Sequence, residues 1–158
     1  MPSKSKFNIA VVGCGTTGPA AALFLKRAGH QVQIFEHAPE CKPVGAGFLL
    51  QPSGMSVLRD LDLLDDTLRF AAKVRWLFAQ TVESKTLLDL PYEEAQPGSF
   101  GAGLHRSVLL SLFLRELDAE KIPVHWGTPI SKLHGRSLQD QAGNQHGPFD
   151  LIVLADGA

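Results

Sequence analysis

Short apolar runs alternate with longer stretches of helical period in the first part of this chain. Residues 7–12 are apolar, largely β-branched and followed by glycine, which is typical of a strand buried in a parallel sheet. Apolar residues then recur at helical spacing over 16–28, with basic residues near the end and Gly29 beyond them. Residues 31–35 alternate as a second strand. The pattern therefore predicts a strand–turn–helix–strand unit with a right-handed crossover.

The rest of the chain predicts shorter elements separated by loops rich in proline and glycine. Further strands are expected at residues 48–50, 74–78, 85–90, 124–126, 130–133 and 149–154. Further helices are expected at residues 53–65, where Ser53 is the expected N-cap, and from Ser107 to about residue 117. Loops are expected at 37–47 and 91–103, and a polar hairpin at 135–147. Helices that alternate with apolar strands indicate an α/β protein with a mostly parallel sheet and a small antiparallel β excursion.

Composition narrows the class further. The chain has 158 residues, 44% of them hydrophobic, and a formal net charge of −1, so it can bury a sizeable core but has no basic excess for nucleic acid. No stretch reaches the ~20 apolar residues of a membrane helix. Lys4 and Lys6 precede an apolar run as in a secretory signal, but Asn8 and the glycines interrupt that run. Cys14 and Cys41 form no CxxC pair, which favours a reduced, cytoplasmic protein.

The chemistry of the chain centres on Gly13-Cys-Gly-Thr-Thr-Gly18, a GxGxxG directly after a strand and at the start of a helix. Gly13 permits the tight turn, Gly15 lets the backbone approach a pyrophosphate, and Gly18 lets helix and strand pack closely. Glu36 ends the second strand, where a carboxylate accepts hydrogen bonds from ribose hydroxyls and repels a 2′-phosphate. The motif predicts an ADP-containing ligand and leaves FAD and NAD open. The alternative is a tight turn with a solvated glutamate.

Three further motifs follow the glycine motif at 13–18 and Glu36, in chain order. They are the glycine segment 43–52, the pair His105-Arg106 before a long helix, and the run Asp150-Leu-Ile-Val-Leu-Ala-Asp156-Gly157. Together they resemble the N-terminal part of the FAD-dependent aromatic hydroxylases, flavoprotein monooxygenases similar to p-hydroxybenzoate, salicylate and urate hydroxylases. The resemblance covers nearly the whole chain. It implies a Rossmann-like FAD-binding domain, with FAD as cofactor, NADH or NADPH as reductant and an aromatic or similar small molecule as substrate.

The resemblance also implies cofactor contacts outside the glycine loop. They are expected at Thr17, His37, Leu49, Arg106, Ile130 and Asp156. Thr17 and His37 would line the adenosine part, the backbone around Ile130 would meet the adenine, and the backbone at Leu49 would lie beside the flavin. The Arg106 fork would reach flavin or pyrophosphate oxygens, and Asp156 would bind at the carboxyl edge of the sheet. On local sequence alone, Arg106 also fits a surface arginine, and Asp156 a turn-forming Asp-Gly.

Other signals are weaker. The histidines show no metal-ligand spacing, so no metal is expected, and no catalytic acid, base or nucleophile can be named. Cys41 has no later cysteine with which to form a redox pair. Trp76, Phe78 and Trp126 are expected in the core or in sheet packing.

The expected organisation is a FAD-binding βαβ with a second helix at 1–72, a β excursion toward the substrate at 73–103, and a return to the FAD-binding domain at 104–158. Members of the family that this chain resembles are much longer than its 158 residues. We therefore expect this chain to be an N-terminal fragment, or to be completed by another chain. Alone, it is expected to catalyse no hydroxylation. It is also expected to leave uncovered the apolar strand at 149–154, which should be central in the sheet. The leading hypothesis is the FAD-binding portion of a monooxygenase. The alternatives are a non-catalytic dinucleotide-binding module or another FAD reductase or oxidase.

Overall fold

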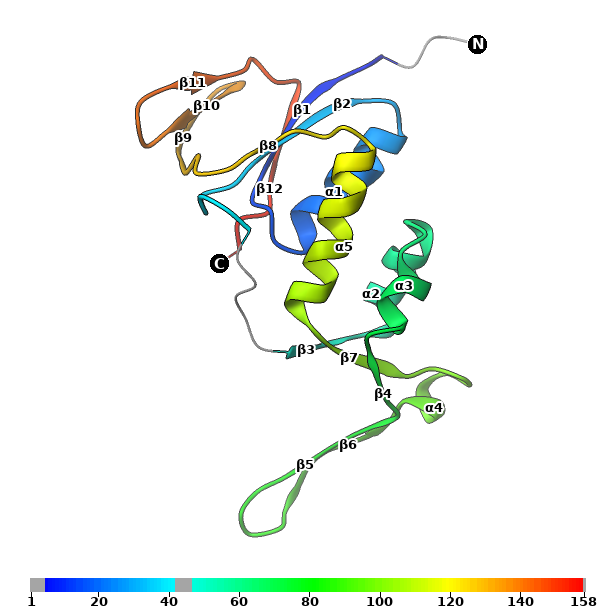
Figure 1. The fold of residues 1–158 in the computed structure, drawn as a ribbon. Coiled ribbons are helices and arrows are strands. Elements are labelled where there is room, and N and C mark those ends of the chain that lie inside the picture. The colour runs from blue at the N-terminus through cyan, green and yellow to red at the C-terminus, as the bar shows by residue number, and fades with distance from the viewer. Residues whose placement is uncertain (1–4, 42–46, 158) are drawn as a thin grey trace. The chain divides into compact units, whose positions relative to one another are not determined.

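The computed structural model describes residues 5–41 and 47–157, and the chain forms two compact units (Figure 1). The first unit comprises residues 1–42 and 110–158, and the second comprises residues 43–109. Helix α5 (Arg106–Ala119) begins in the second unit and ends in the first. The boundaries expected at residues 72 and 103 stay a prediction.

A four-stranded parallel sheet forms the centre of the first unit, in the order β12-β1-β2-β8 (Figure 1). Its strands are β1 (Asn8–Val12), β2 (Gln31–Phe35), β8 (Val124–His125) and β12 (Leu151–Leu154). All three strand pairs are parallel. This arrangement confirms the predicted α/β class with a mostly parallel sheet.

The last strand leaves apolar residues exposed at a sheet edge, as predicted, whereas its predicted central position is not observed within the described residues. Among the described residues β12 pairs only with β1, so it lies at one edge of the sheet and not in its centre. The sheet extends from β1 in both directions, with β2 and β8 on one side and β12 on the other. Leu151 and Leu154 are 44% and 57% exposed on this edge strand.

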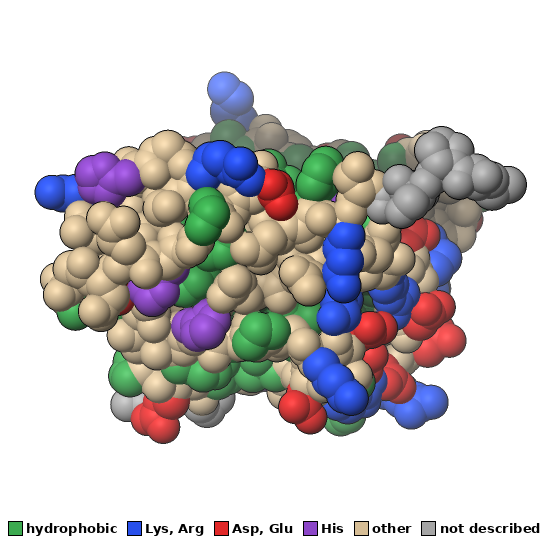
Figure 2. Space-filling view, turned by 90° about the horizontal axis from the view of Figure 1, so that it is seen from above, with side chains coloured by type: hydrophobic (Ala, Val, Ile, Leu, Met, Phe, Trp, Pro, Cys, Tyr) green, Lys and Arg blue, Asp and Glu red, His purple; other side chains and the backbone are tan. Residues whose placement is uncertain are grey.

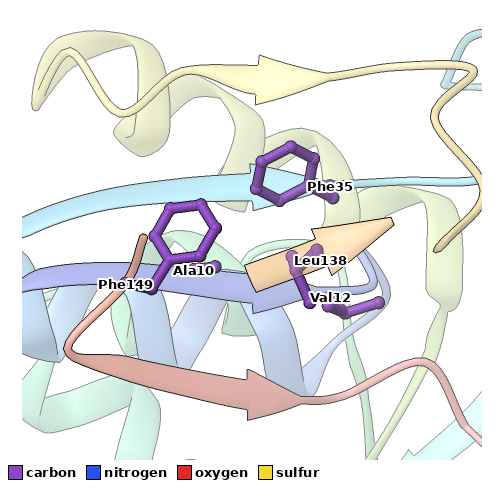
Figure 3. Packing of buried hydrophobic residues seen from close by; sticks show 5 residues of the cluster. All are labelled: Ala10, Val12, Phe35, Leu138 and Phe149. Atoms are coloured by element: carbon purple, nitrogen blue, oxygen red, sulfur yellow. The ribbon is translucent and has the colours of Figure 1, made fainter. Parts of the chain in front are cut away.

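Strand β1 is buried on both faces, as its unbroken apolar run predicts. Val11 faces helix α1 (Thr17–Arg27), where it lies against Gly18. On the opposite face a buried cluster joins the sheet to the segment before β12 (Figure 3). Its members are Ala10, Val12, Phe35, Leu138 and Phe149. Successive residues of the strand therefore serve two different packing layers.

A three-stranded antiparallel sheet contributes to that cluster. Its strands are β9 (Ile130–His134), β10 (Ser137–Asp140) and β11 (Gln145–His146), in the order β11-β10-β9. The segment 135–147 forms the polar hairpin that its sequence predicts, with Leu138 fully buried on one side. Arg136 donates from Nε to the Phe149 carbonyl at 2.8 Å and also bonds to Asp150, which anchors the hairpin to the start of β12.

The second unit is built on a smaller antiparallel sheet and short helices. The sheet has the order β3-β7-β4, with β3 (Gly47–Leu50), β4 (Ala72–Val74) and β7 (Gly101–His105). The helices are α2 (Pro52–Asp60), α3 (Leu64–Leu68) and α4 (Tyr92–Ala95). A separate hairpin pairs β5 (Trp76–Gln80) with β6 (Thr86–Pro91).

Three local predictions in this unit are wrong. Helix α2 starts at Pro52 with Gln51 as its N-cap, because proline is suited to the first helical position, so Ser53 is not the cap. The predicted helix 53–65 also divides, since Asp62 adopts a left-handed φ of 62° between α2 and α3. The expected loop 91–103 contains α4 and the first residues of β7, whose pairing with β3 and β4 is not visible in local sequence.

Of the two placements expected for the aromatic residues at 76 and 78, the core is wrong, whereas packing on a sheet is observed. Trp76 and Phe78 are 56% and 51% exposed on the β5–β6 hairpin, where their rings meet edge to face at 5.8 Å. Trp76 Nε1 donates to Asp89 at 2.8 Å. A two-stranded hairpin has no interior of its own, so alternate apolar residues on it remain at the surface.

The surface carries mixed charge. On the face shown in Figure 2, acidic and basic side chains are interspersed on one side and histidines gather on the other. No helix within 5–41 and 47–157 has the length and apolar character needed to cross a membrane.

Candidate functional site

The glycine loop after β1 contains two glycines that the fold itself requires. Gly13 has a φ of 101°, and a Cβ there would lie 2.5 Å from the Ala155 carbonyl oxygen. A Cβ at Gly18 would lie 2.0 Å from the Gly13 carbonyl oxygen. Both distances are far below van der Waals contact, so the turn and the approach of α1 to β1 exclude a side chain at either position.

Gly15 differs from both. No protein atom lies within 4 Å of the position a Cβ would take there, and its φ lies outside the left-handed region. Neither packing nor backbone conformation explains a glycine at this position. The open space at Gly15 is a cradle that a side chain would fill, and it fits the close approach of a pyrophosphate.

The first turn of α1 is suited to the same anion. The N-cap residue Thr16 makes no side-chain capping bond, and the first turn contains no acidic residue. Thr17 is exposed as the first helical residue. Backbone N–H groups at a helix N-terminus lack intrahelical partners and attract negative charge. The loop and helix together therefore offer a site for phosphate oxygens.

Glu36 lies directly after β2 and is 7% exposed. Its Oε2 accepts the backbone N–H of Cys14 at 2.6 Å, which ties the glycine loop to the end of β2. Its Oε1 accepts the N–H of Ala38 at 2.9 Å and lies 2.7 Å from His37 Nδ1. A carboxylate has about four lone-pair positions, so capacity for a ribose hydroxyl remains.

A cavity of about 470 Å³ opens at the carboxyl edge of the parallel sheet. Its lining consists of Val12, Gly13, Phe35, His37, Thr128, Pro129, Ile130, Gln141 and Asp156. The structure thus brings together four of the predicted site residues, Gly13, His37, Ile130 and Asp156. In open parallel sheets, ligands bind at this edge.

Sequence reasoning missed two polar residues of the cavity, Thr128 and Gln141. Both lie in connections between short strands, and no local pattern distinguishes them. Backbone bonds hold this wall in place: Thr128 N–H donates to the Glu36 carbonyl at 2.8 Å, and Gln141 N–H donates to the Pro129 carbonyl at 2.9 Å. The wall is therefore attached both to the end of β2 and to the β10–β11 turn.

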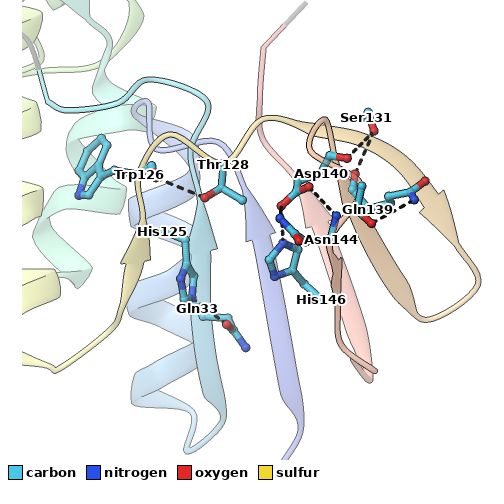
Figure 4. Close-up of polar contacts among 10 residues, drawn as sticks. Gln33, His125, Trp126, Thr128, Ser131, Gln139, Asp140, Asn144 and His146 are labelled. Carbon is cyan, nitrogen blue, oxygen red and sulfur yellow. Dashed lines mark hydrogen bonds and ion pairs between the residues drawn. The ribbon is translucent and has the colours of Figure 1, made fainter.

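A cluster of polar side chains stabilises the β10–β11 turn (Figure 4). Asp140 accepts from His146 Nε2 at 3.0 Å, and from the backbone N–H and side-chain Nδ2 of Asn144 at 2.8 and 3.0 Å. These bonds lower the pKa of the Asp140 carboxyl to about 2. His125 stacks on Phe35 at 4.7 Å, and burial, with the charge of His146, lowers the pKa of His125.

Two further predicted residues lie in the second unit. Leu49 is half-buried in β3 opposite Gly103 of β7, and Arg106 is exposed as the first residue of α5. His105 ends β7 rather than starting the helix. Residues 43–46 of the glycine segment lie outside the described residues. The flavin contacts expected at Leu49 and Arg106 stay predictions.

The Cys14 thiol lies buried within the glycine loop. Burial, together with the charge of Glu36, raises the pKa of the Cys14 thiol to about 12, so this thiol stays protonated. Within the described part of the chain, no group of three or more His, Cys, Asp or Glu side chains is placed to hold a metal ion.

Comparison with known proteins gives relatives over nearly the whole chain. The sequence is 40% identical over 156 residues to a 3-amino-4-hydroxybenzoate 2-monooxygenase of Streptomyces cremeus, covering 94% of this chain and 39% of that protein. It is 28% identical over 161 residues to the FAD-dependent monooxygenase notI' of Aspergillus versicolor, covering 99% of this chain and 37% of that protein.

Among solved structures, 2-methyl-3-hydroxypyridine-5-carboxylic acid oxygenase in its tetrameric form is similar with a TM-score of 0.82 and 26% identity. That similarity covers 98% of this chain and 40% of the other. The chain thus spans about 37–40% of the length of these three relatives.

These relatives confirm the predicted resemblance to FAD-dependent monooxygenases and, at the level of the family, FAD as the cofactor. The protein family described as "FAD binding domain" matches residues 6–135, which is most of the sequence. This chain therefore belongs to the FAD binding domain family.

Proposed function

We propose that this chain holds the ADP half of FAD in the first unit and forms the FAD-binding part of an NAD(P)H-dependent monooxygenase that hydroxylates an aromatic or similar small molecule. The observation that carries the proposal is the open cradle at Gly15, which neither packing nor backbone conformation explains. It lies in the loop between β1 and the uncapped N-terminus of α1, and Gly13 of the same loop lines the cavity.

Each predicted site residue of the first unit has its own role in this proposal. The backbone at Gly15 and Thr17 binds the pyrophosphate, since N–H groups there are free for an anion. Glu36 accepts hydrogen bonds from the ribose hydroxyls, and its bond to Cys14 keeps the loop in position for the phosphates. His37 and the backbone of Ile130 contact the adenosine. Asp156, which lies beside Gly13 in the cavity lining, contacts the cofactor, and Gly18 allows the close packing of helix and strand.

The redox chemistry belongs to the cofactor. When bound, the flavin would supply hydride acceptance from NADH or NADPH and oxygen activation, and the residues of this chain would supply binding and orientation. Leu49 and Arg106 are proposed as flavin contacts on the basis of the resemblance. Relatives named as acting on 3-amino-4-hydroxybenzoate and 6-hydroxynicotinate support an aromatic substrate. A cytoplasmic location and the absence of a nucleic-acid partner are part of the same proposal.

Titration with FAD, ADP and FMN tests the binding site directly. FMN carries the flavin and a phosphate but no adenylate, so a site for the ADP half binds FAD and ADP and discriminates against FMN. Isothermal titration calorimetry on the 158-residue chain measures all three affinities. Binding of FMN as tight as that of FAD, or no binding of FAD and ADP, would contradict the proposed site.

Oxidation of NADH or NADPH tests the monooxygenase part of the proposal. In the natural full-length protein loaded with FAD, we expect oxidation of the reductant to accelerate when the correct aromatic acid is added. FAD binding without any such oxidation, across a panel of aromatic acids, would favour a non-catalytic dinucleotide-binding module instead.

A further inference from the structure

Gln141 occupies a defined place in the wall of the first-unit cavity. It directly follows β10 and lines the cavity with Thr128, Pro129 and Ile130. Its backbone N–H donates to the Pro129 carbonyl at 2.9 Å, so the turn is attached to another segment of the cavity lining. Gln141 therefore approaches the cavity from a backbone position that a hydrogen bond holds.

The turn that carries Gln141 is also held from within. Asp140, the preceding residue, accepts bonds from Asn144 and His146 through its side chain (Figure 4). Its backbone N–H donates to the Asn144 carbonyl at 3.0 Å, and its carbonyl accepts from Gly143 at 3.1 Å. A turn with this many internal bonds presents the side chain that follows Asp140 from a restricted set of directions.

The side-chain amide of Gln141 has its hydrogen-bonding capacity available. It forms no hydrogen bond to any residue within 5–41 and 47–157, and it carries both a donor and an acceptor. Two other polar groups of the lining already have protein partners: the Thr128 hydroxyl donates to the Trp126 carbonyl at 3.3 Å, and His37 Nδ1 lies 2.7 Å from Glu36. The amide is therefore well suited to a ligand that offers an adjacent donor and acceptor.

We propose that Gln141 recognises the base of the bound nucleotide and makes the site selective for adenine over guanine. Its amide oxygen accepts from the exocyclic amino group of adenine while its NH₂ donates to the adjacent ring nitrogen, the pairing glutamine makes with adenine in DNA. Guanine presents a carbonyl oxygen where adenine presents the amino group, which leaves the amide oxygen facing another acceptor. The inference rests on the proposed function, in that the cavity holds an adenylate.

Titration of the 158-residue chain with ADP and with GDP tests this role. The variants are Gln141→Met, which keeps the length of the side chain but removes the amide, and Gln145→Met as a matched control. Gln145 is exposed on β11 of the same hairpin and lies outside the cavity lining. The ratio of the ADP and GDP affinities is the readout, because a general change in stacking or stability affects both ligands alike.

The wild-type chain is expected to prefer ADP, and Gln141→Met is expected to reduce the preference by at least about fivefold, the lower limit for one bidentate base contact. Gln145→Met keeps the wild-type ratio, and thermal unfolding confirms that both variants fold. A wild-type ratio in Gln141→Met, with ADP still bound, overturns the role of Gln141 and leaves the proposed function intact. If the wild-type protein binds neither ADP nor GDP, both proposals are overturned.

Discussion

Replacing Gly18 and Gly15 separately by alanine distinguishes a glycine that the fold requires from one that the ligand requires. At Gly18 a Cβ would lie 2.0 Å from the Gly13 carbonyl oxygen and 3.1 Å from its carbon, both backbone atoms of the glycine loop. Relief requires moving α1 away from β1, and overpacking of this kind costs up to about 3 kcal/mol. Alanine in a helix returns about 1 kcal/mol, so the expected net loss of unfolding free energy is about 2 kcal/mol.

Gly15→Ala is expected to behave in the opposite way. With no atom within 4 Å and no left-handed φ, the methyl group meets nothing in the protein. Such a substitution leaves stability unchanged or raises it by up to about 1 kcal/mol, because the unfolded chain loses freedom. The same methyl group occupies the space proposed for the pyrophosphate, so ADP affinity should fall by about tenfold or more, a cost of about 1.4 kcal/mol.

Urea unfolding followed by circular dichroism measures the first quantity, and calorimetric titration with ADP measures the second. The reasoning requires a separation between the two variants: Gly18→Ala loses stability and Gly15→Ala loses affinity. Gly15→Ala that binds ADP as wild type would refute the assignment of the open cradle. Gly18→Ala with wild-type stability would refute the packing argument.

The remaining predictions concern the carboxylates, the histidine and the core beside the cavity. Glu36→Gln places an amide where two backbone N–H groups now donate, so urea unfolding should show a loss of about 1–3 kcal/mol, and unchanged stability would contradict the role of this side chain in holding the glycine loop. Because hydrogen bonds in the folded protein lower the pKa of Asp140 from its ordinary value of 3.8 to about 2, stability present above pH 4 is lost as the pH falls toward 2. In an Asp140→Asn variant, the free energy of unfolding measured with urea should lack this decrease between pH 4 and pH 2. Because burial lowers the pKa of His125 from 6.5, the unfolded chain takes up the proton first, so stability also decreases as the pH falls below 6.5, and His125→Gln should remove this slope. Leu138→Ala removes a fully buried side chain and should cost about 2–5 kcal/mol in the same unfolding assay, with a smaller loss indicating that the hairpin detaches from the sheet readily.

The sequence alone determines the βαβ unit and the glycine loop because the relevant forces there are local. A β-branched run, helical periodicity and glycine spacing act over a few neighbours, and the observed β1, α1 and β2 match residues 7–35 closely. Gly13, Gly15 and Gly18 belong to the same motif, however, and only the structure shows at which of these positions the fold itself requires glycine. Gly13 and Gly18 meet backbone at 2.5 and 2.0 Å, whereas Gly15 meets nothing.

Long-range contacts decide the rest of the site, and local sequence contains no trace of them. The edge position of β12 depends on its pairing with β1, and the wall formed by Thr128 and Gln141 depends on bonds to Glu36 and Pro129. Residues from loops with no distinguishing pattern thereby become the lining of a cavity. The sequence determines where the glycine turn and the following helix form, because turn and helix are local structures. Tertiary structure alone determines which side chains line the cavity, because hydrogen bonds between distant segments place them there.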